Sequence, residues 1–306
     1  MKIISEKDLK TPLMQKTVVA LGSFESLHKG HLKIIRRTVL FAKENGLKSL
    51  VSIFRDPVLK EKDLVCETLE ERLEILEQLA VNIVVIFDFD DKIRNMDYKS
   101  FFKNYIADKF CAKQIFAGFN YRFGYKALGD TKKLAELCRE NNIGLFIEEP
   151  VMEDKLISST YIHDLIKQGN PDEIIRYLGR PYSITGTVEI GRKIGNKIGF
   201  PTANISYPKN KAIIADGVYF GKTHTDGLTC YSIINVGEQP TVTKKHTPKV
   251  EVHLINYSGS LYGKKIKTEF LKKLRNQKNF ENLEGLKSQL EYDKETAMRL
   301  AAVQPK

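Results

Sequence analysis

The chain has 306 residues, of which 42% are hydrophobic and 28% are charged, and its formal net charge is +11. This length exceeds what one hydrophobic core usually supports, so two domains are expected, and the composition excludes disordered and fibrous proteins. The first ten residues lack the apolar core of a signal peptide, and no stretch approaches the ~18 apolar residues of a membrane span. These features predict a cytoplasmic protein with no membrane partner.

The positive charge is compatible with nucleic acid, an anionic surface or a substrate rich in phosphate. Lysine pairs are scattered along the chain without interleaved aromatic residues, which favours a solvated surface over specific nucleic-acid binding. The cysteines are far apart and form no CxxC pair, so free thiols are expected at Cys66, Cys111, Cys138 and Cys230. We expect a monomer or a weak oligomer.

The first half of the chain alternates short apolar runs with longer amphipathic stretches. Strands are expected at residues 17–21, 49–54, 83–87, 114–117 and 145–148. Helices are expected from about Gly30 and at about 69–79, 100–109 and 131–141. This βαβ rhythm predicts an α/β fold, a doubly wound, Rossmann-like nucleotide-binding domain with a parallel sheet covered by helices.

The second half changes character after Gly179. Before it, Ser158, Ser159 and Thr160 offer caps for a helix that ends at Gly169, and a last short helix runs to Tyr177. After it, apolar residues alternate with a period of two, with strands expected at 182–185, 218–220, 231–234 and 250–255. A small antiparallel β-barrel is therefore expected, crossed by a C-terminal helix at about 280–303 with apolar positions at Leu283, Leu286 and Leu290. The predicted domains are 1–180 and 181–306.

Residues 22–31 leave the first strand and enter the first helix at the carboxyl edge of the inferred sheet, where α/β proteins bind ligands. His28 and His31 stand three residues apart, so both imidazoles can face one anion, which the helix N-terminus also favours. The alternative is that these histidines are merely exposed polar residues.

The sequence from His28 to His31 resembles the HxGH motif of the nucleotidyltransferase superfamily, which transfers an adenylyl group from ATP. Residues 118–124 and 157–160 resemble two further elements of its FAD synthetase branch. The resemblance implies that His28 and His31 are catalytic, stabilising charge on the phosphates. It also implies an ATP site that includes Gly22, Phe24, Ser158, Ser159 and Thr160, and a flavin contact at Asn120.

The chain departs from that family pattern in several places, and residues 54–58 lack a histidine that commonly lies there between two prolines. Glu25 and Ser26 stand where the family usually has aspartate and glycine, and His163 stands where it usually has arginine. Arginine gives a permanent bidentate grip on phosphate, whereas a neutral histidine gives at most one donor. Lys29 or Lys126 could compensate, but an impaired or specialised adenylyltransferase is an open alternative.

Residues 186–204 carry glycines at Gly191, Gly195 and Gly199, a spacing that lets backbone N–H groups approach phosphates closely. The pattern fits neither a Walker nor a Rossmann loop. A glycine-rich hairpin without function is the alternative.

The run from Gly199 to Asn204 resembles the Gly-Phe-Pro-Thr-Ala-Asn signature of riboflavin kinases. By that resemblance Thr202 and Asn204 coordinate Mg²⁺ and the ATP phosphates, and magnesium prefers such hard oxygen ligands. The three glycines belong to the same ATP site. Glu251 lies in a segment resembling the strand with the catalytic glutamate, on the face opposite Val250 and Val252. A carboxylate there can accept the proton of the riboflavin 5′-hydroxyl.

Residues 235–241 and 261–263 resemble further family segments, and Arg275 falls with Phe280 where the flavin-side loop lies. The chain is thereby identified as a member of the bacterial bifunctional riboflavin kinase/FAD synthetase family. The resemblance implies phosphorylation of riboflavin to FMN with MgATP in the second domain and adenylylation of FMN to FAD in the first. The alternatives are one activity only, above all the kinase, or a non-catalytic flavin- or RNA-binding regulator.

Overall fold

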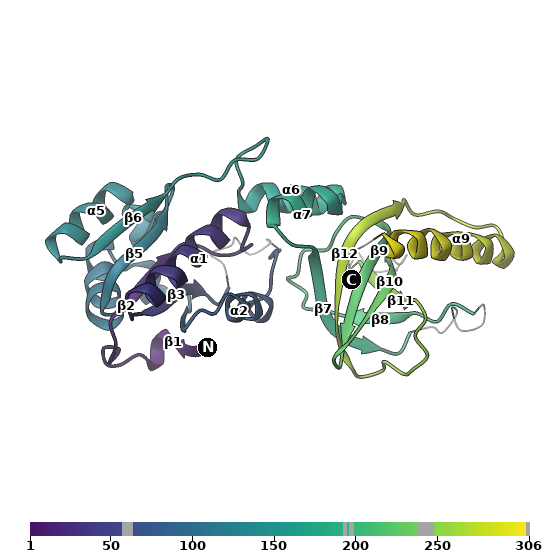
Figure 1. The fold of residues 1–306 in the computed structure, drawn as a ribbon, viewed down its shortest axis with the longest axis horizontal. Coiled ribbons are helices and arrows are strands. Elements are labelled where there is room, and N and C mark those ends of the chain that lie inside the picture. Colours follow the sequence, from purple (N-terminus) through teal and green to yellow (C-terminus); the bar gives the residue numbers. More distant parts are fainter. Residues whose placement is uncertain (57–63, 192–194, 196–198, 238–247, 304–306) are drawn as a thin grey trace. The chain divides into compact units, whose positions relative to one another are not determined.

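The computed structural model describes residues 1–56, 64–191, 195, 199–237 and 248–303. The chain forms two compact units, Met1–Ser159 and Thr160–Lys306 (Figure 1). Among the described residues, no helix has both the length and the apolar character needed to cross a membrane. The four cysteines are free thiols, as predicted.

The first unit is built on a six-stranded sheet with the order β1-β4-β3-β2-β5-β6, and every neighbouring pair is parallel. The strands are β1 (Lys2–Ser5), β2 (Thr17–Leu21), β3 (Lys48–Phe54), β4 (Ile83–Phe87), β5 (Ala112–Gly118) and β6 (Gly144–Glu148). All five predicted strands are confirmed. β1 is an addition, a four-residue strand that pairs with β4 at the sheet edge.

Helices cover both faces of this sheet, which confirms the doubly wound fold. On one face lie α1 (Lys29–Glu44) and α2 (Leu69–Gln78), which pack residues such as Ile35 and Leu76 against Val18 and Val84. The other face carries α3 (Asp91–Arg94), α4 (Tyr98–Phe101), the π-helix η2 (Phe102–Lys109) and α5 (Thr131–Glu140). The described residues of this unit also form the short 3₁₀ turns η1 (Glu6–Asp8) and η3 (Tyr125–Ala127).

The order of the strands defines where a ligand can bind. From β2 the chain continues to β3 and β4 on one side, whereas β6 extends the sheet from β5 on the other side. The carboxyl ends of β2 and β5 therefore flank a topological switch point, the position at which open α/β sheets form a binding crevice.

The second unit contains a closed antiparallel barrel with the order β10-β11-β8-β7-β12-β9, closed by pairing of β10 with β9. The strands are β7 (Tyr182–Glu189), β8 (Ala203–Ser206), β9 (Gly217–Thr225), β10 (Leu228–Gly237), β11 (Lys249–Leu254) and β12 (Lys265–Arg275). The four predicted strands and the barrel are confirmed. Each of these described strands is therefore paired on both sides.

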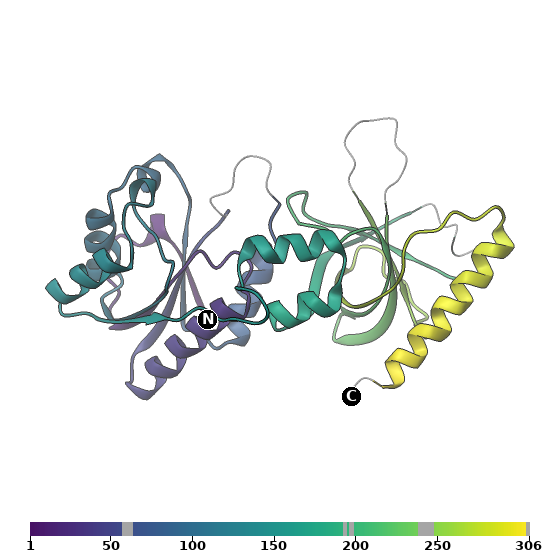
Figure 2. The same cartoon turned by 90° about the horizontal axis from the view of Figure 1, so that it is seen from above.

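The C-terminal helix α9 (Leu283–Ala302) lies along the outer wall of the barrel (Figure 2). Its buried Ala297 packs against Val218, Phe220 and Ile233 of the barrel. The predicted helix and its packing against the barrel are confirmed, although Leu283 at its N-terminal end is 62% exposed. The helix meets the barrel through its C-terminal half.

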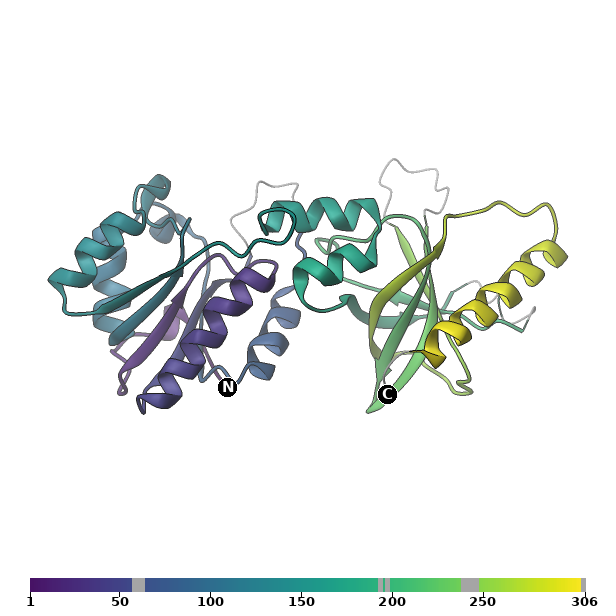
Figure 3. The ribbon, with the colours of Figure 1, turned by 45° about the horizontal axis from the view of Figure 1, so that its top comes forward.

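Helices α6 (Ser159–Gln168) and α7 (Pro171–Leu178) lie side by side (Figures 2 and 3), with the rings of Tyr161 and Tyr177 4.9 Å apart. The backbone N–H of Ala215 donates to the carbonyl of Ile166 at 3.0 Å. α7 also contacts β7 and β12. These contacts place the division of the chain after Ser159, earlier than the predicted boundary at residue 180.

Candidate active sites

The loop between β2 and α1 brings the two predicted histidines together. His28 is the N-cap of α1, and its Nδ1 accepts the backbone N–H of His31 at 3.3 Å. The two imidazole rings stack, with centroids 3.8 Å apart and planes 14° apart. Both side chains line one cavity.

This cavity has a volume of about 400 Å³ and lies at the carboxyl ends of β2, β5 and β6. Of the predicted nucleotide and flavin residues, its lining includes Gly22, His28, His31, Asn120, Ser158 and Ser159. Thr160 is not among the lining residues. Phe24 is fully buried, with its ring edge-on to His31 at 5.2 Å, so it supports the histidine from behind.

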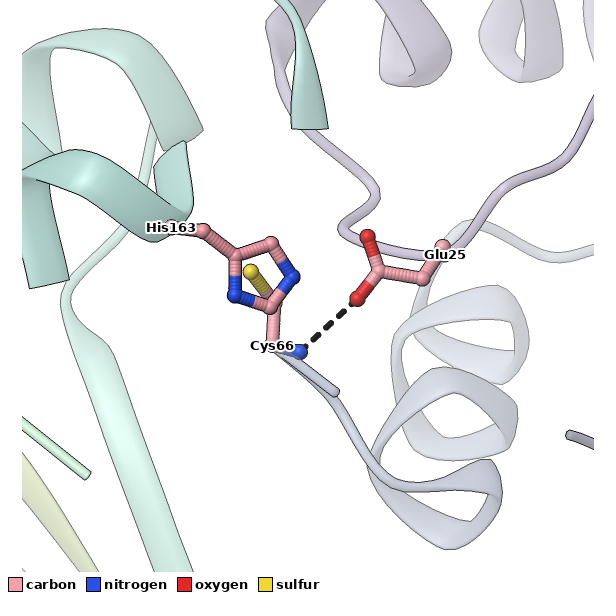
Figure 4. A group of neighbouring side chains, drawn as sticks. All are labelled: Glu25, Cys66 and His163. Carbon is pink, nitrogen blue, oxygen red and sulfur yellow. Dashed lines mark hydrogen bonds between the residues drawn. The ribbon is translucent and has the colours of Figure 1, made fainter. Parts of the chain in front are cut away.

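The two residues that depart from the family pattern in this loop are both buried and hydrogen-bonded. The backbone N–H of Cys66 donates to the Glu25 carboxylate at 2.8 Å (Figure 4). The hydroxyls of Ser26 and Ser159 are 2.9 Å apart. The third residue drawn in Figure 4, His163, lies on α6 of the second unit. Glu25 and Ser26 therefore tie the loop to its surroundings.

The loop also contains backbone strain, because Phe24 and Leu27 adopt positive φ values of 45° and 43°. Such conformations cost a side-chain-bearing residue of order 1–3 kcal/mol, and they persist where the surrounding structure holds them. The contacts of Glu25 and Ser26 lie between these two residues, where they can hold the loop in its strained shape.

Neither lysine considered as a substitute for the missing arginine is placed for that role. Lys29 forms an ion pair with Glu153 at 2.7 Å. Lys126 lies over the Tyr125 ring at 5.2 Å and is not a lining residue of the cavity. The lining instead includes Arg122, a residue of the 118–124 segment to which the sequence assigned no role.

In the barrel, strand register places the predicted catalytic carboxylate beside the predicted metal ligand. Glu251 on β11 is the direct partner of Asn204 on β8 and of Asn235 on β10. Val250 and Val252 are fully buried on the other face of β11. The Glu251 side chain is 26% exposed, and Lys249 on the same face pairs with it at 2.6 Å.

Asn204 has a polar atom suited to a ligand. Its Oδ1 is buried and has no hydrogen-bond partner in the part of the chain that the structure describes. Gly191 approaches this side chain so closely that a Cβ at Gly191 would lie 2.0 Å from the Asn204 Nδ2. A buried amide oxygen without a donor is costly, so a cation or a donor from a ligand is expected to satisfy it.

The other predicted glycines shape the same loop. A Cβ at Gly195 would lie 2.1 Å from the carbonyl oxygen of Phe200, and Gly199 has a positive φ of 80°. Residues 192–194 and 196–198 of the glycine-rich stretch, and 238–241 of the segment after Asn235, lie outside the described residues.

His253, to which the sequence assigned no role, holds this loop in place. Its Nδ1 donates to the carbonyl of Pro201 at 2.8 Å, and its ring lies 5.4 Å from that of Phe200. Burial lowers the pKa of His253 below its usual 6.5, and nearby Lys294 acts in the same direction. The sequence signal that could have found it is its position two residues after Glu251, on the same strand face.

A cavity of about 310 Å³ opens on the opposite face of β8 and β11. Thr202 lines it, together with Val252, Leu254, Leu261 and Tyr262. Glu251 and Asn204 do not line it. Thr202 thus marks the point at which this mostly apolar cavity meets the polar row of Asn204 and Glu251.

Arg275, predicted to contact flavin, is engaged within the protein. Its guanidinium donates to the Asp293 carboxylate of α9 from Nε at 3.0 Å and from Nη2 at 2.8 Å, and to the Asn276 carbonyl from Nη1. The side chains of Arg275 and Asp293 are 14% and 3% exposed. The neighbouring Gln277 donates to the Asn235 Oδ1 at 2.7 Å, which brings the 275–280 segment next to the partner of Glu251.

Family comparisons agree with this division of the chain. Residues 10–161 match the FAD synthetase family model, and residues 178–301 match the riboflavin kinase model. The bifunctional riboflavin kinase/FMN adenylyltransferase of Bacillus subtilis is 32% identical over 93% of this chain and 92% of its own length. The protein of the same description from Buchnera aphidicola subsp. Schizaphis graminum is 30% identical over 96% of each chain.

The chain also matches a solved structure, described as a macrolide-efflux protein from Streptococcus pneumoniae. The TM-score is 0.89 at 27% identity, covering 97% of this chain and 99% of that one. This likeness supports the fold, and the efflux description belongs to that protein alone. The two family models together span most of this chain, which therefore belongs to the family of bifunctional riboflavin kinase/FMN adenylyltransferases, transferases of flavin biosynthesis.

Proposed function

We propose that the barrel unit transfers the γ-phosphoryl group of MgATP to the 5′-hydroxyl of riboflavin, and that the parallel-sheet unit transfers the adenylyl group of a second ATP to the FMN formed. The observation that carries this proposal is the pairing of Glu251 with Asn204. It joins a carboxylate that can accept a proton to a buried amide oxygen that can hold a cation.

In the kinase step, the Glu251 carboxylate accepts the proton of the riboflavin 5′-hydroxyl while that oxygen attacks the γ-phosphorus. The bond from the γ-phosphorus to the bridging oxygen breaks, and ADP leaves with the electron pair. The orphaned Oδ1 of Asn204 and the hydroxyl of Thr202 would hold Mg²⁺, a fit that the hard-oxygen character of both supports. When bound, this ion neutralises charge on the phosphates.

The two substrates of the kinase step can be assigned to opposite sides of the polar row formed by Asn204 and Glu251. The apolar cavity beyond Thr202 is suited to the adenine ring, with the triphosphate reaching back past Thr202. Gln277 bonds to Asn235, so the segment that carries Arg275 adjoins Glu251 from the other side and is suited to flavin. The fork of Arg275 is held by Asp293, so its contribution to flavin binding is to position this segment.

In the adenylyl-transfer step, a phosphate oxygen of FMN attacks the α-phosphorus of ATP, and pyrophosphate leaves. His28, His31 and the N-terminus of α1 would bind the phosphates where charge develops. Gly22, Ser158 and Ser159 line the same cavity and are suited to contact ATP, and Asn120 is suited to contact flavin.

The remaining assignments follow from the sequence. We place adenylyl transfer in the first unit and phosphorylation in the second, in a cytoplasmic protein that is a monomer or a weak oligomer. Riboflavin, FMN and ATP are its partners, without a specific nucleic acid or a membrane. Full adenylyl transfer is favoured over an impaired domain, because Glu25 and Ser26 are accommodated by hydrogen bonds.

The test supplies the purified protein with MgATP and either riboflavin or FMN, and separates the flavin products by chromatography. The wild-type protein should make FMN and FAD from riboflavin. Glu251→Gln should lose phosphorylation by about 10²–10⁴-fold, as expected for a missing general base, yet still make FAD from supplied FMN. Phosphorylation that survives in Glu251→Gln would remove the proposed base.

The matched control is Glu189→Gln. Glu189 on β7 is also a direct partner of Asn204, from the side opposite Glu251. The substitution removes one carboxylate beside the same asparagine but keeps the proposed base Glu251. The rate of phosphorylation should therefore stay within a few-fold of the wild-type rate. Equal losses in both variants would show that local negative charge, rather than proton acceptance by Glu251, is what the site requires.

A further inference from the structure

We propose that Arg122 binds the 5′-phosphate of FMN in the adenylyl-transfer cavity, and thereby makes this site prefer FMN to riboflavin. The inference rests on the proposed adenylyl transfer and names the residue that recognises its acceptor substrate. It starts from the observation that Arg122 lines the cavity.

The backbone around Arg122 is fixed on both sides. The N–H of Tyr121 donates to the carbonyl of Gly118 at 3.0 Å, and Phe123 exchanges two backbone hydrogen bonds with Gly129 at 3.1 and 2.9 Å. The rings of Tyr121 and Phe123 stack at 5.4 Å with planes 11° apart, and Phe123 is buried in the core. Arg122 lies between these two residues, is exposed, and lines the cavity.

The other charged groups that line the cavity do not satisfy Arg122. Glu148 is buried and is paired with Lys33 at 2.6 Å and with Arg37 at 3.3 Å. Glu149 is exposed, and no ion pair between it and Arg122 occurs among the described residues. Asp130, which feels the charge of Arg122, accepts the N–H of Lys133 at 2.9 Å as the N-cap of α5.

No hydrogen bond or ion pair occupies the Arg122 guanidinium in the part of the chain that the structure describes, and a guanidinium matches a phosphate with two parallel hydrogen bonds. With Arg122, the lining of the cavity has two places that are suited to bind an anion. One is the start of α1 with His28 and His31 after β2, and the other is Arg122 after β5. Adenylyl transfer needs two, because the attacking FMN phosphate and the ATP phosphates must approach one another despite their like charge.

The position of Asn120 decides which phosphate belongs to Arg122. Asn120 lines the cavity two residues earlier on the same segment and is assigned to flavin. The histidines and the helix N-terminus occupy the side suited to ATP. A phosphate bound at Arg122 therefore belongs to the flavin substrate, and riboflavin, which has no phosphate, gains nothing from this residue.

The experiment measures FAD formation from FMN and ATP by the full-length protein and by Arg122→Ala, with each substrate varied in turn. Loss of a bidentate charge-assisted contact should raise the KM for FMN by about 10- to 100-fold. The KM for ATP and the rate of riboflavin phosphorylation should change little. Arg122→Lys, which keeps the charge but loses the fork, should recover part of the effect.

Lys126→Ala is the matched control, because it removes one positive charge from the same segment at a position that does not line the cavity. An unchanged KM for FMN in Arg122→Ala would overturn the proposal. So would a rise in the KM for ATP instead, or an equal loss in Lys126→Ala. If the wild-type protein makes no FAD from FMN, the proposed adenylyl transfer itself is wrong. That outcome is distinguishable from a failure of the Arg122 proposal alone.

Discussion

The hydroxyl of Ser26, in the loop that leads into α1, lies 2.9 Å from the hydroxyl of Ser159. Ser159 is the last residue of the first unit and lines the cavity that also contains His28 and His31. Ser26 is completely buried. The bond joins two segments of the proposed ATP site that are far apart in the chain. A serine at a position where the family usually has glycine is therefore a structural link.

Removing this link should weaken adenylyl transfer without abolishing it. Ser26→Ala leaves the Ser159 hydroxyl without its partner, and a lost hydrogen bond of about 1 kcal/mol corresponds to about a five-fold effect. We expect the KM for ATP in FAD formation to rise by about that factor, while riboflavin phosphorylation is unchanged. Steady-state kinetics of both reactions on the same preparation tests this, and an unaltered KM for ATP would contradict it.

Replacing Gly191 should weaken the kinase. The Cβ of an alanine there would lie 2.0 Å from the Asn204 Nδ2, so the proposed metal ligand would have to move. Gly191→Ala should lower riboflavin phosphorylation by at least about 10-fold, since small misplacements of reacting groups have effects of this size or larger. FAD formation from FMN should be retained.

The control for this substitution is Gly285→Ala. Gly285 lies in the first turn of α9, and the nearest atom to an added Cβ there is 3.4 Å away. Both variants add one methyl group to the second unit. If Gly191→Ala phosphorylates riboflavin as well as Gly285→Ala does, the packing of Gly191 against Asn204 is not needed for activity.

Strands buried on both faces could be predicted from the sequence, since continuous apolar runs need no knowledge of their partners. β2 and β4 coincide with their predicted ranges. β1 could not be predicted, because its four residues are half exposed and are held by pairing with β4. β8 and β12 were missed for a related reason: β8 is short, and β12 is rich in lysine and is defined by its neighbours β7 and β9.

The candidate sites divide in the same way. His28, Asn204 and Glu251 stand in motifs, so their residue types and spacing marked them. The place of Arg122 in the cavity lining and the hydrogen bond from Gln277 to Asn235 could not be predicted from the sequence, because each depends on segments that only the fold brings together. For Arg275, the family resemblance implied a flavin contact, whereas Asp293 on α9 engages its donors.

The ion pair of Arg275 with Asp293 should anchor α9 to the barrel. Removing one member of a buried pair leaves an uncompensated charge, at a cost of about 3–5 kcal/mol. Asp293→Ala should therefore lower the free energy of unfolding of the second unit by about 3 kcal/mol. Chemical denaturation followed by circular dichroism measures this, and Glu291→Ala, an exposed position on the same helix, is the control. A difference below 1 kcal/mol between the two variants would show that the pair does not anchor the helix.

His253 should make the second unit sensitive to acid. Burial keeps its pKa below the usual 6.5, so the folded state favours the neutral ring. Between that lowered value and 6.5, the unfolded chain binds a proton that the folded chain does not, and stability therefore falls as the pH falls. The contribution is complete above 6.5 and is lost by at most about 1.4 kcal/mol per pH unit below it.

Protonation of His253 should also affect the kinase site, because His253 donates a hydrogen bond to the carbonyl of Pro201, the residue before Thr202. His253→Asn can still donate to the Pro201 carbonyl but does not titrate, so it should keep riboflavin phosphorylation and lose the acid-dependent part of the stability. His253→Leu removes the donor and should lower phosphorylation over the whole pH range. Unfolding and phosphorylation measured from pH 5 to 8 separate these cases. If the wild-type protein and His253→Asn lose stability in parallel below pH 6.5, the acid sensitivity arises from another group and the role of His253 is limited to packing.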